Sequence, residues 1–353
     1  MSKPVMRIGQ RAIGADHPPY VIAELSANHN GDLAAALHLL EAARQAGADA
    51  VKLQTYTADT ITIDHDSPEF RIRGGLWDGN TLYRLYQQAY TPWEWHPALF
   101  ARAAELGLTM FSSPFDPTAV DFLERLAAPA YKIASFELVD LPLIRRVAAT
   151  GKPMILSTGM ADLPEVAAAV AAAEEGGCRE LALLHCVSGY PTPHEECNLR
   201  AIDTLANAFP RAVIGLSDHT LETTVPVAAV ALGAAIIEKH FTNCRADGGP
   251  DAAFSLEPDE LAAMCRGCRV AWSALGAGGW ELKPSEAGNR IFRRSLYVVA
   301  DMAEGERFTP ENVRSIRPAH GLPPAELPRI LGRRARRAIA RGTPLRQDLV
   351  EEL

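Results

Sequence analysis

Two histidines, His219 and His240, stand at or just past the ends of two strands that the sequence predicts. Ser217 and His219 have the same parity in the first strand, so alternation puts them on one face. Glu238 and His240 share a face of the second strand in the same way. If the strands are parallel neighbours, the imidazoles converge at the carboxyl edge of the sheet, where α/β enzymes hold their substrates. This pair favours a divalent metal with few protein ligands, which leaves coordination positions for water and substrate.

The alternative is that each histidine only hydrogen-bonds the backbone of a loop. That explanation is the better one for a single histidine. Two histidines in the same register of adjacent strands favour a ligand site instead.

Polar side chains also end the other predicted strands. A barrel interior is normally filled by branched apolar side chains, so strands that all finish in polar groups are better explained by a ligand site. One such residue could be a helix cap or a salt-bridge partner, but caps do not account for so many strands that behave alike. The residues are Glu24, Asn28 and Asn30; Lys52 and Gln54; Ser112 and Ser113; Lys132, Ser135 and Glu137; Ser157; His185 and Ser188; Ser217 and His219; Glu238 and His240.

Lys52 and Lys132 lie within strands that are otherwise largely apolar. A buried ammonium group is costly unless an opposite charge compensates it, so two lysines that face one cavity indicate an anionic ligand. Serines and helix N-termini nearby favour a ligand that carries phosphate and carboxylate groups. The alternative is that each lysine pairs with a carboxylate of the protein, Glu24 or Glu137.

The elements that must position these residues alternate between strand and helix as far as residue 275. Helical stretches such as DLAAALHLLEAARQAG and LPEVAAAVAAAEEGG end in Gly. This alternation predicts an α/β fold, a (β/α)8 TIM barrel rather than an open sheet. The longest interruption, 58–90, is expected to be a loop excursion with a small hairpin on the active-site face. The strands are expected at 20–26, 50–55, 108–113, 131–135, 153–158, 181–187, 213–218 and 235–241.

The sequence changes character after residue 275. The Gly/Pro-rich stretch GAGGWELKPSEAGN predicts a linker at 276–288, between a catalytic barrel domain at 1–275 and a small accessory domain at 289–353. The accessory domain holds 13 Arg against 8 Asp and Glu, whereas the rest of the chain holds 22 Lys and Arg against 35 Asp and Glu. A basic tail on an acidic body suggests that the tail docks on a body, its own or a partner's.

The composition excludes several classes of protein. The net charge of -8 does not favour nucleic acid, and the C-terminal Arg-rich run fits a basic accessory domain better than an RNA-binding segment. The start of the chain has no apolar signal region, and the longest apolar run, 225–237, is interrupted by Pro226 and too short to span a membrane. The six cysteines are scattered, with one C-x-x-C pair in a helical pattern, which favours reduced thiols. We therefore expect a cytoplasmic protein without a membrane partner.

Short motifs are spread over nearly the whole chain: AELSANHNGD, DAVKLQTY, FSSPFD, PAYKIASFE, ILSTGM, GLSDHT, EKHFT and GGPD. Together they resemble the N-acetylneuraminate (sialic acid) synthase family, including a C-terminal domain similar to its antifreeze-like (SAF) module. Within that family, GLWDGNTLYRLYQQAYTPWEW and FSLEP look most like the pseudaminic acid synthase branch. The resemblance implies that phosphoenolpyruvate condenses with 2,4-diacetamido-2,4,6-trideoxy-L-altrose to give a nine-carbon nonulosonic acid and phosphate.

The resemblance also implies roles for residues at matching positions. His219 and His240 are the implied ligands of Mn²⁺, Mg²⁺ or Co²⁺, and with Glu24, a carboxylate beside the reacting carbon, they are the predicted catalytic residues. Ser188, in HCVSGYP, stands where the sialic acid synthases have Asn, so its role is open. The predicted phosphoenolpyruvate contacts are Lys52, Ser113, Lys132, Ser135, Ser157, Ser188 and Ser217. The predicted sugar contacts are Glu24, Gln54, Glu137, Tyr190, Asp251 and, from the antifreeze-like domain, Arg317.

Other functions remain open at this point. N-acetylneuraminate and legionaminic acid synthases would share the predicted site, so only sugar turnover separates them. A non-catalytic sugar-binding protein is an alternative of another class, suggested by the antifreeze-like domain and disfavoured by Glu24, the two lysines and the two histidines. The resemblance further implies a domain-swapped homodimer in which each antifreeze-like domain covers the partner's site, with Arg317 acting in trans.

Overall fold

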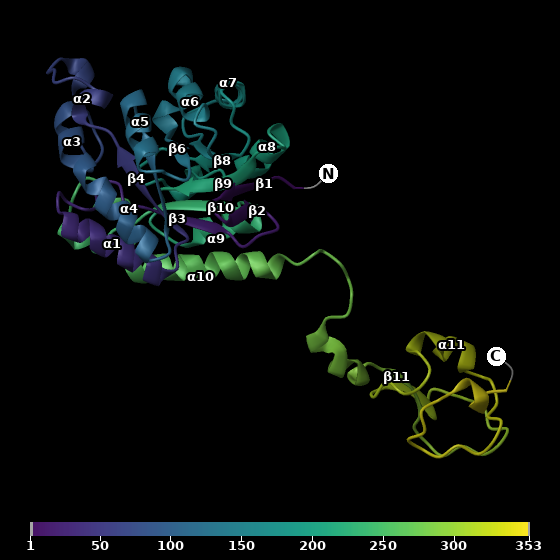
Figure 1. The fold of residues 1–353 in the computed structure, drawn as a ribbon. Helices are drawn as coiled ribbons and strands as arrows, with labels where there is room; N and C mark the ends of the chain where they lie inside the picture. Colours follow the sequence, from purple (N-terminus) through teal and green to yellow (C-terminus); the bar gives the residue numbers. More distant parts are fainter. Residues whose placement is uncertain (1–2, 352–353) are drawn as a thin grey trace. The chain divides into compact units, whose positions relative to one another are not determined.

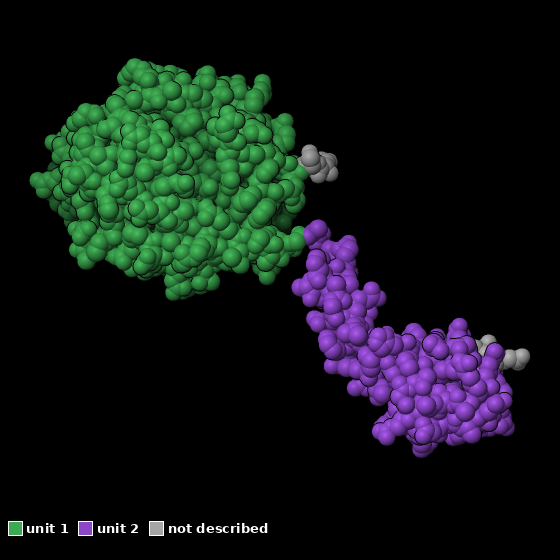
Figure 2. All heavy atoms as spheres, turned by 60° about the horizontal axis from the view of Figure 1, so that its bottom comes forward, with its two compact units in different colours: residues 1–276 green, residues 277–353 purple. Residues whose placement is uncertain are grey.

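The chain forms two compact units, Met1–Gly276 and Ala277–Leu353, which Figure 2 shows in different colours. The computed structural model describes residues 3–351, so the outermost residues of both predicted domains lie outside the described part. The boundary falls just after the last helix of the first unit, α10 (Pro258–Leu275). Within 3–351, no helix is long and apolar enough to cross a lipid bilayer.

Eight parallel strands close into a barrel in the order β10-β3-β4-β5-β6-β7-β8-β9, which confirms the predicted (β/α)8 fold (Figure 1). Each predicted strand is present, with small shifts at its ends. The strands are buried on both faces because helices cover the outside, and this is why they are nearly continuous apolar runs. They are β3 (Tyr20–Glu24), β4 (Ala50–Thr55), β5 (Thr109–Pro114), β6 (Tyr131–Ile133), β7 (Met154–Ser157), β8 (Leu181–Cys186), β9 (Val213–Asp218) and β10 (Ile236–His240).

Helices follow the strands and form the outer ring of the barrel. The start of α7 (Leu163–Glu175) shows how the sequence fixes them: the Asp162 side chain accepts the Glu165 N–H at 2.8 Å, and the Glu165 side chain accepts the Asp162 N–H at 3.0 Å. This capping box satisfies backbone donors that the helix itself cannot. With α10, the other helices of the ring are α1 (Leu33–Ala46), α4 (His96–Glu105), α5 (Pro117–Arg125), α6 (Leu141–Ala148), α8 (Ala201–Ala208) and α9 (Thr224–Ala231).

An antiparallel hairpin that the sequence did not predict, β1 (Val5–Ile8) and β2 (Arg11–Gly14), closes the N-terminal end of the barrel. Its turn contains Gly9 with a φ of 57°, a conformation that glycine adopts without strain. Met6, Ile8 and Ile13 are buried there in one apolar cluster with residues from the beginnings of the barrel strands.

The excursion after β4 contains two short helices, α2 (Ala58–Ile61) and α3 (Leu82–Ala89). Between them the chain doubles back, with one antiparallel bridge from Arg71 to Thr81 and a backbone hydrogen bond from Ile72 to residue 80 at 2.9 Å. Because it follows a strand, the excursion lies at the carboxyl end of the barrel, as expected.

The C-terminal unit has a small core of its own, which includes Leu296, Phe308 and Ile330. Its strands β11 (Ser295–Val298) and β12 (Val313–Ile316) pair antiparallel, and α11 (Leu327–Ile330) follows them. The 3-10 helix η7 (Pro284–Phe292) begins inside the stretch expected to be a linker. Part of 276–288 is therefore regular structure.

Candidate active site

The predicted site residues of the barrel gather at the carboxyl ends of its strands. Glu24, Ser157 and His240 are the last residues of β3, β7 and β10. A closed parallel barrel brings such ends together around one mouth. Arg317 follows β12 in the C-terminal unit. Of the others, Lys52 and Gln54 lie in β4, Ser113 in β5, Lys132 in β6 and Ser217 in β9, while Ser135, Glu137, Ser188, Tyr190, His219 and Asp251 lie in the segments that follow strands.

Lys52 and Lys132 are buried and paired with carboxylates. Lys52 Nζ forms an ion pair with Glu24 and lies 3.7 Å from Oε1 of Glu238. Lys132 Nζ donates to the same Glu238 oxygen at 3.3 Å. The alternative in which the lysines pair with the protein therefore holds for Lys52 with Glu24, whereas Lys132 pairs with Glu238 rather than Glu137. We call these two lysines, Glu24 and Glu238 the charge quartet.

The charge quartet separates the proton affinities of its two carboxyl groups. Burial raises the pKa of Glu24, although the Lys52 ammonium opposes that rise. Burial also works against ionisation of Glu238, but the charges of Lys132 and Lys52 together lower its pKa. For Lys52 the two carboxylates overcome the effect of burial and raise the pKa, whereas burial lowers the pKa of Lys132. Glu238 is therefore the carboxyl group that stays ionised, and Glu24 is the one that more readily binds a proton.

Serine hydroxyls lie at the carboxyl ends of strands near these lysines, in β5 and β7 and just after β6. Ser113 Oγ accepts a hydrogen bond from Lys52 Nζ at 3.3 Å. Ser157 Oγ is buried without a partner among the described residues. Ser135 Oγ accepts the Gly159 N–H at 3.1 Å. A Cβ at Gly159 would collide with the hydroxyls of Ser135 and Ser188, so this close approach requires glycine. The hydroxyls can donate to phosphate oxygens.

His219 and His240 face each other with ring centroids 5.4 Å apart. His219 Nδ1 donates to the Val187 carbonyl at 2.8 Å, so in the neutral imidazole the lone pair is on Nε2. Nδ1 of His240 is buried and has no hydrogen-bond partner in the described part of the chain. Burial lowers the pKa of His240 well below its usual value, so this imidazole is neutral.

The donor chemistry of this pair fits a divalent ion, which accepts imidazole nitrogen together with oxygen ligands from water and substrate. Among residues 3–351, no group of three or more His, Cys, Asp or Glu side chains is arranged to hold a metal ion. The two histidines would therefore be its protein ligands, with the remaining positions open.

A hydrogen-bonded chain links Glu24 to Asp251. Gln54 Nε2 donates to Glu24 Oε1 at 3.1 Å and to Ser26 Oγ at 3.0 Å, and Ser26 Oγ donates to Asp251. The sequence did not single out Ser26, which joins a predicted sugar contact in β4, Gln54, to one in the segment after β10, Asp251. Burial raises the pKa of Asp251, and it raises the pKa of Glu137 to about 7. Oε2 of Glu137 is buried without a partner among the described residues, so it is available to a ligand.

Aromatic side chains enclose the histidines. The ring centroids of Tyr190 and His219 are 4.3 Å apart, and those of Phe254 and His240 are 4.9 Å apart. Trp77, from the excursion, lies 5.8 Å from Tyr190, and its Nε1 donates to the Pro250 carbonyl at 2.9 Å. The sequence did not select Phe254 or Trp77 as site residues. The sequence does hold an indication for Trp77, because it lies in the Gly-rich GLWDGN segment of a loop expected on the active-site face.

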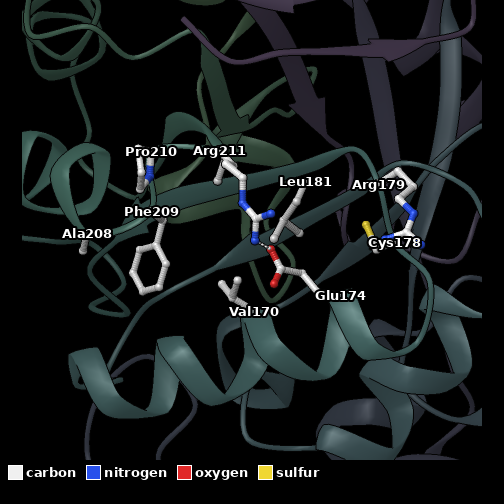
Figure 3. Close-up of a pocket in the computed structure, with 10 residues that line it drawn as sticks. Val170, Glu174, Cys178, Arg179, Leu181, Ala208, Phe209, Pro210 and Arg211 are labelled. Carbon is white, nitrogen blue, oxygen red and sulfur yellow. Dashed lines mark hydrogen bonds and ion pairs between the residues drawn. The ribbon is translucent and has the colours of Figure 1, made fainter. Parts of the chain in front are cut away.

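A cavity of about 390 Å³ lies at the other end of the barrel (Figure 3). It is lined by the end of α7 and by the segments that lead into β8 and β9. Arg211 donates to Glu174 at 2.6 Å beside it. Loops that lead into barrel strands belong to the face associated with stability rather than catalysis, and no predicted site residue lines this cavity.

Comparison with known proteins extends through both units. The NeuB family profile matches residues 39–279, and the SAF domain profile matches residues 293–351. The chain is 45% identical to the pseudaminic acid synthase of Campylobacter jejuni over 97% of this chain and 99% of that protein. It is 35% identical to the N,N'-diacetyllegionaminic acid synthase of Legionella pneumophila over 97% of this chain and 98% of that protein. A crystal structure of the spore coat polysaccharide biosynthesis protein of Bacillus subtilis, 34% identical, covers 99% of both chains with a TM-score of 0.67.

Proposed function

The chain belongs to the NeuB family, and we propose that it is a pseudaminic acid synthase. It condenses phosphoenolpyruvate with 2,4-diacetamido-2,4,6-trideoxy-L-altrose and releases phosphate. The observation that carries the proposal is an identity of 45% to a pseudaminic acid synthase, against 35% to a legionaminic acid synthase matched over a similar extent. The residues that this reaction needs from the barrel lie together at one end of it.

Lys52 and Lys132 bind the carboxylate and phosphate of phosphoenolpyruvate. Without a substrate, Glu24 and Glu238 neutralise both ammonium groups, which makes their burial tolerable. When phosphoenolpyruvate binds, its negative groups replace part of the pairing of the two lysines with Glu24 and Glu238. The serine hydroxyls around Gly159 donate to its phosphate oxygens.

His219 and His240 would hold the divalent ion. Bound there, Mn²⁺, Mg²⁺ or Co²⁺ would supply Lewis-acid polarisation of the aldehyde oxygen. The Val187 carbonyl fixes the tautomer of His219, and burial keeps His240 neutral. Tyr190 and Phe254 pack beside the imidazoles and restrict access of bulk water.

Glu24 accepts a proton from the water that attacks C2. C3 of phosphoenolpyruvate attacks the aldehyde carbon, and positive character develops at C2, beside the carboxylate. Burial raises the pKa of Glu24, which suits a group that takes a proton from the water adding to C2. The tetrahedral carbon then expels phosphate, whose charge Lys52 and Lys132 stabilise.

Turnover of three sugars tests this assignment. Purified protein with Mn²⁺ and phosphoenolpyruvate is offered the altrose sugar, its 2,4-diacetamido mannose analogue or N-acetylmannosamine, and phosphate is measured. We expect release with the altrose sugar at a kcat/KM far above that for the other two. Preference for a mannose-type sugar would instead make the chain a legionaminic or N-acetylneuraminate synthase, and sugar binding without turnover would support the non-catalytic alternative.

We also propose the domain-swapped homodimer that the family resemblance implies, with Arg317 reaching the partner's barrel. The SAF match at 293–351 and the opposite net charges of the two parts of the sequence support it. A His240→Ala chain and an Arg317→Ala chain, dissociated and reassociated together, are expected to recover ~25% of wild-type sites if Arg317 acts in trans. If it acts in cis, every site carries a lesion and no activity returns.

A further inference from the structure

A buried charged cluster lies on the outer side of the barrel wall, behind the two histidines. It consists of Asp218, Thr220 and Lys239, whose exposed fractions are 4%, 0% and 0%. Asp218 and Lys239 are register partners across β9 and β10. Because side chains alternate along a strand, Asp218 and Lys239 point away from the barrel axis, whereas Ser217, Glu238 and His240 point inward. We call the three residues the strand clamp.

The contacts of the strand clamp centre on one ammonium group. Lys239 Nζ forms an ion pair with Asp218 and donates to the backbone carbonyl of Thr220. Asp218 closes the loop, since its Oδ1 accepts the Thr220 N–H at 3.2 Å and its Oδ2 accepts the Thr220 hydroxyl at 2.8 Å. A single side chain next to His240 therefore holds the residues on both sides of His219.

The position of these charges is not explained by packing. The other outward positions of the same strands, including Ile214, Leu216 and Ile237, belong to the apolar core between barrel and helices. An apolar pair would fill the last outward position without the desolvation that a buried ammonium and carboxylate require. The charges appear only at the level of the histidines.

We propose that Asp218, Thr220 and Lys239 are positioning residues that fix His219 relative to His240 and thereby set the affinity for the divalent ion. This inference rests on the proposed function, because it concerns the metal site. A site with only two protein ligands depends closely on where each one stands. His219 has a second anchor in the Val187 carbonyl, but Nδ1 of His240 has none among the described residues. His240 directly follows Lys239 in β10, so the contacts of the Lys239 side chain with Asp218 and Thr220 tie the strand beside His240 to the segment that carries His219.

Binding of Mn²⁺ to the full-length protein, measured by titration calorimetry without substrates, tests the strand clamp independently of turnover. The Asp218→Leu/Lys239→Met double variant leaves no lone buried charge. We expect it to fold and to bind Mn²⁺ about 10- to 100-fold more weakly than the wild type. Its kcat should approach the wild-type value at saturating Mn²⁺, because the residues that contact the substrates are unchanged.

A matched control removes a charge pair from another part of the barrel. Lys152 Nζ lies 2.6 Å from Glu124 Oε1, before β7 begins, at the N-terminal end. The Lys152→Met/Glu124→Leu variant should keep wild-type affinity for Mn²⁺.

Wild-type affinity in the folded double variant would overturn the strand clamp. If that variant does not fold, Thr220→Val removes only the hydroxyl, and affinity for Mn²⁺ should fall a few-fold; unchanged affinity would again overturn the inference. A wild type that binds no Mn²⁺ would overturn the metal site and the strand clamp together. A wild type that binds Mn²⁺ but turns over no sugar would overturn only the proposed synthase.

Discussion

The two ends of the barrel are made from the same strands but from opposite kinds of residue. In β3 the inward-facing positions run from Tyr20 and Ile22 to Glu24, and in β10 they run from Ile236 to His240. The N-terminal end forms one apolar cluster with the hairpin, whereas the carboxyl end buries the charge quartet and two histidines. Buried charge of this kind contributes little net stability, so the apolar end and the core between barrel and helices must supply it.

This difference gives each end its own experimental signature. Changes at the carboxyl end should alter turnover more than stability, and changes at the N-terminal end should do the reverse. Proteins commonly accept such a stability cost at functional sites and offset it elsewhere.

The largest effect is expected from removal of a histidine. In His219→Ala or His240→Ala, turnover should fall by at least about 10³-fold, or about 4 kcal/mol of activation free energy, because the proposed metal site loses one of its two protein ligands. Steady-state phosphate release measures the loss, and a circular dichroism melt checks the fold. His38→Ala, on the exposed surface of α1, is the control. Full turnover of the wild type in excess chelator would contradict the prediction.

At the opposite end, Ile13→Ala should act on stability. The side chain is fully buried in the apolar cluster, so its truncation should lower the free energy of unfolding by about 3 kcal/mol. The kcat of the folded protein should stay unchanged. Denaturant titration together with an active-site assay separates the two quantities. Val5→Ala, on the same hairpin but 50% exposed, should have little effect on either. Loss of kcat without loss of stability would break the distinction between the two ends.

The sequence predicted the barrel because its strands and helices are local, periodic units. It missed the hairpin because VMRI and RAIG are only four residues each, and their role depends on contacts with strands far along the chain. Local pattern carries no information on such long-range packing.

The same distinction applies to the site. Parity placed Glu238 on the same face as His240, but it could not show that Lys132 reaches Glu238 across the barrel at 3.3 Å. Ser26 lies in a turn and Phe254 in a single turn of 3-10 helix, where no periodicity indicates which way a side chain points. Ser26 has a φ of 42°, which no pattern in the sequence indicates.

A more moderate effect at the carboxyl end should come from Trp77→Ala. Trp77 packs near Tyr190, a predicted sugar contact, so its loss should raise KM for the sugar about 10-fold, or about 1.4 kcal/mol, and leave KM for phosphoenolpyruvate nearly unchanged. Initial rates with each substrate varied in turn provide the measurement. Leu76→Ala, 49% exposed on the neighbouring position, is the matched control. Equal changes in both KM values would show that Trp77 supports the site as a whole.

The smallest effect concerns Glu137, which makes the stability cost of the carboxyl end measurable by pH. Burial raises its pKa to about 7, so between pH 6 and 8 the folded chain holds a proton that the unfolded chain has already lost. More protons are bound in the folded state, and its stability therefore falls as pH rises through 7. The expected loss from this one group is about 1 kcal/mol between pH 6 and 8.

Glu137→Gln cannot titrate, so urea titrations at the two pH values should show it losing about 1 kcal/mol less than the wild type. Other titrating groups cancel in that difference, and Glu195→Gln, at an exposed position, should behave like the wild type. Equal losses in wild type and Glu137→Gln would mean that Glu137 is already ionised at pH 6. The carboxyl end would then accommodate its charge without the cost that the comparison of the two ends requires.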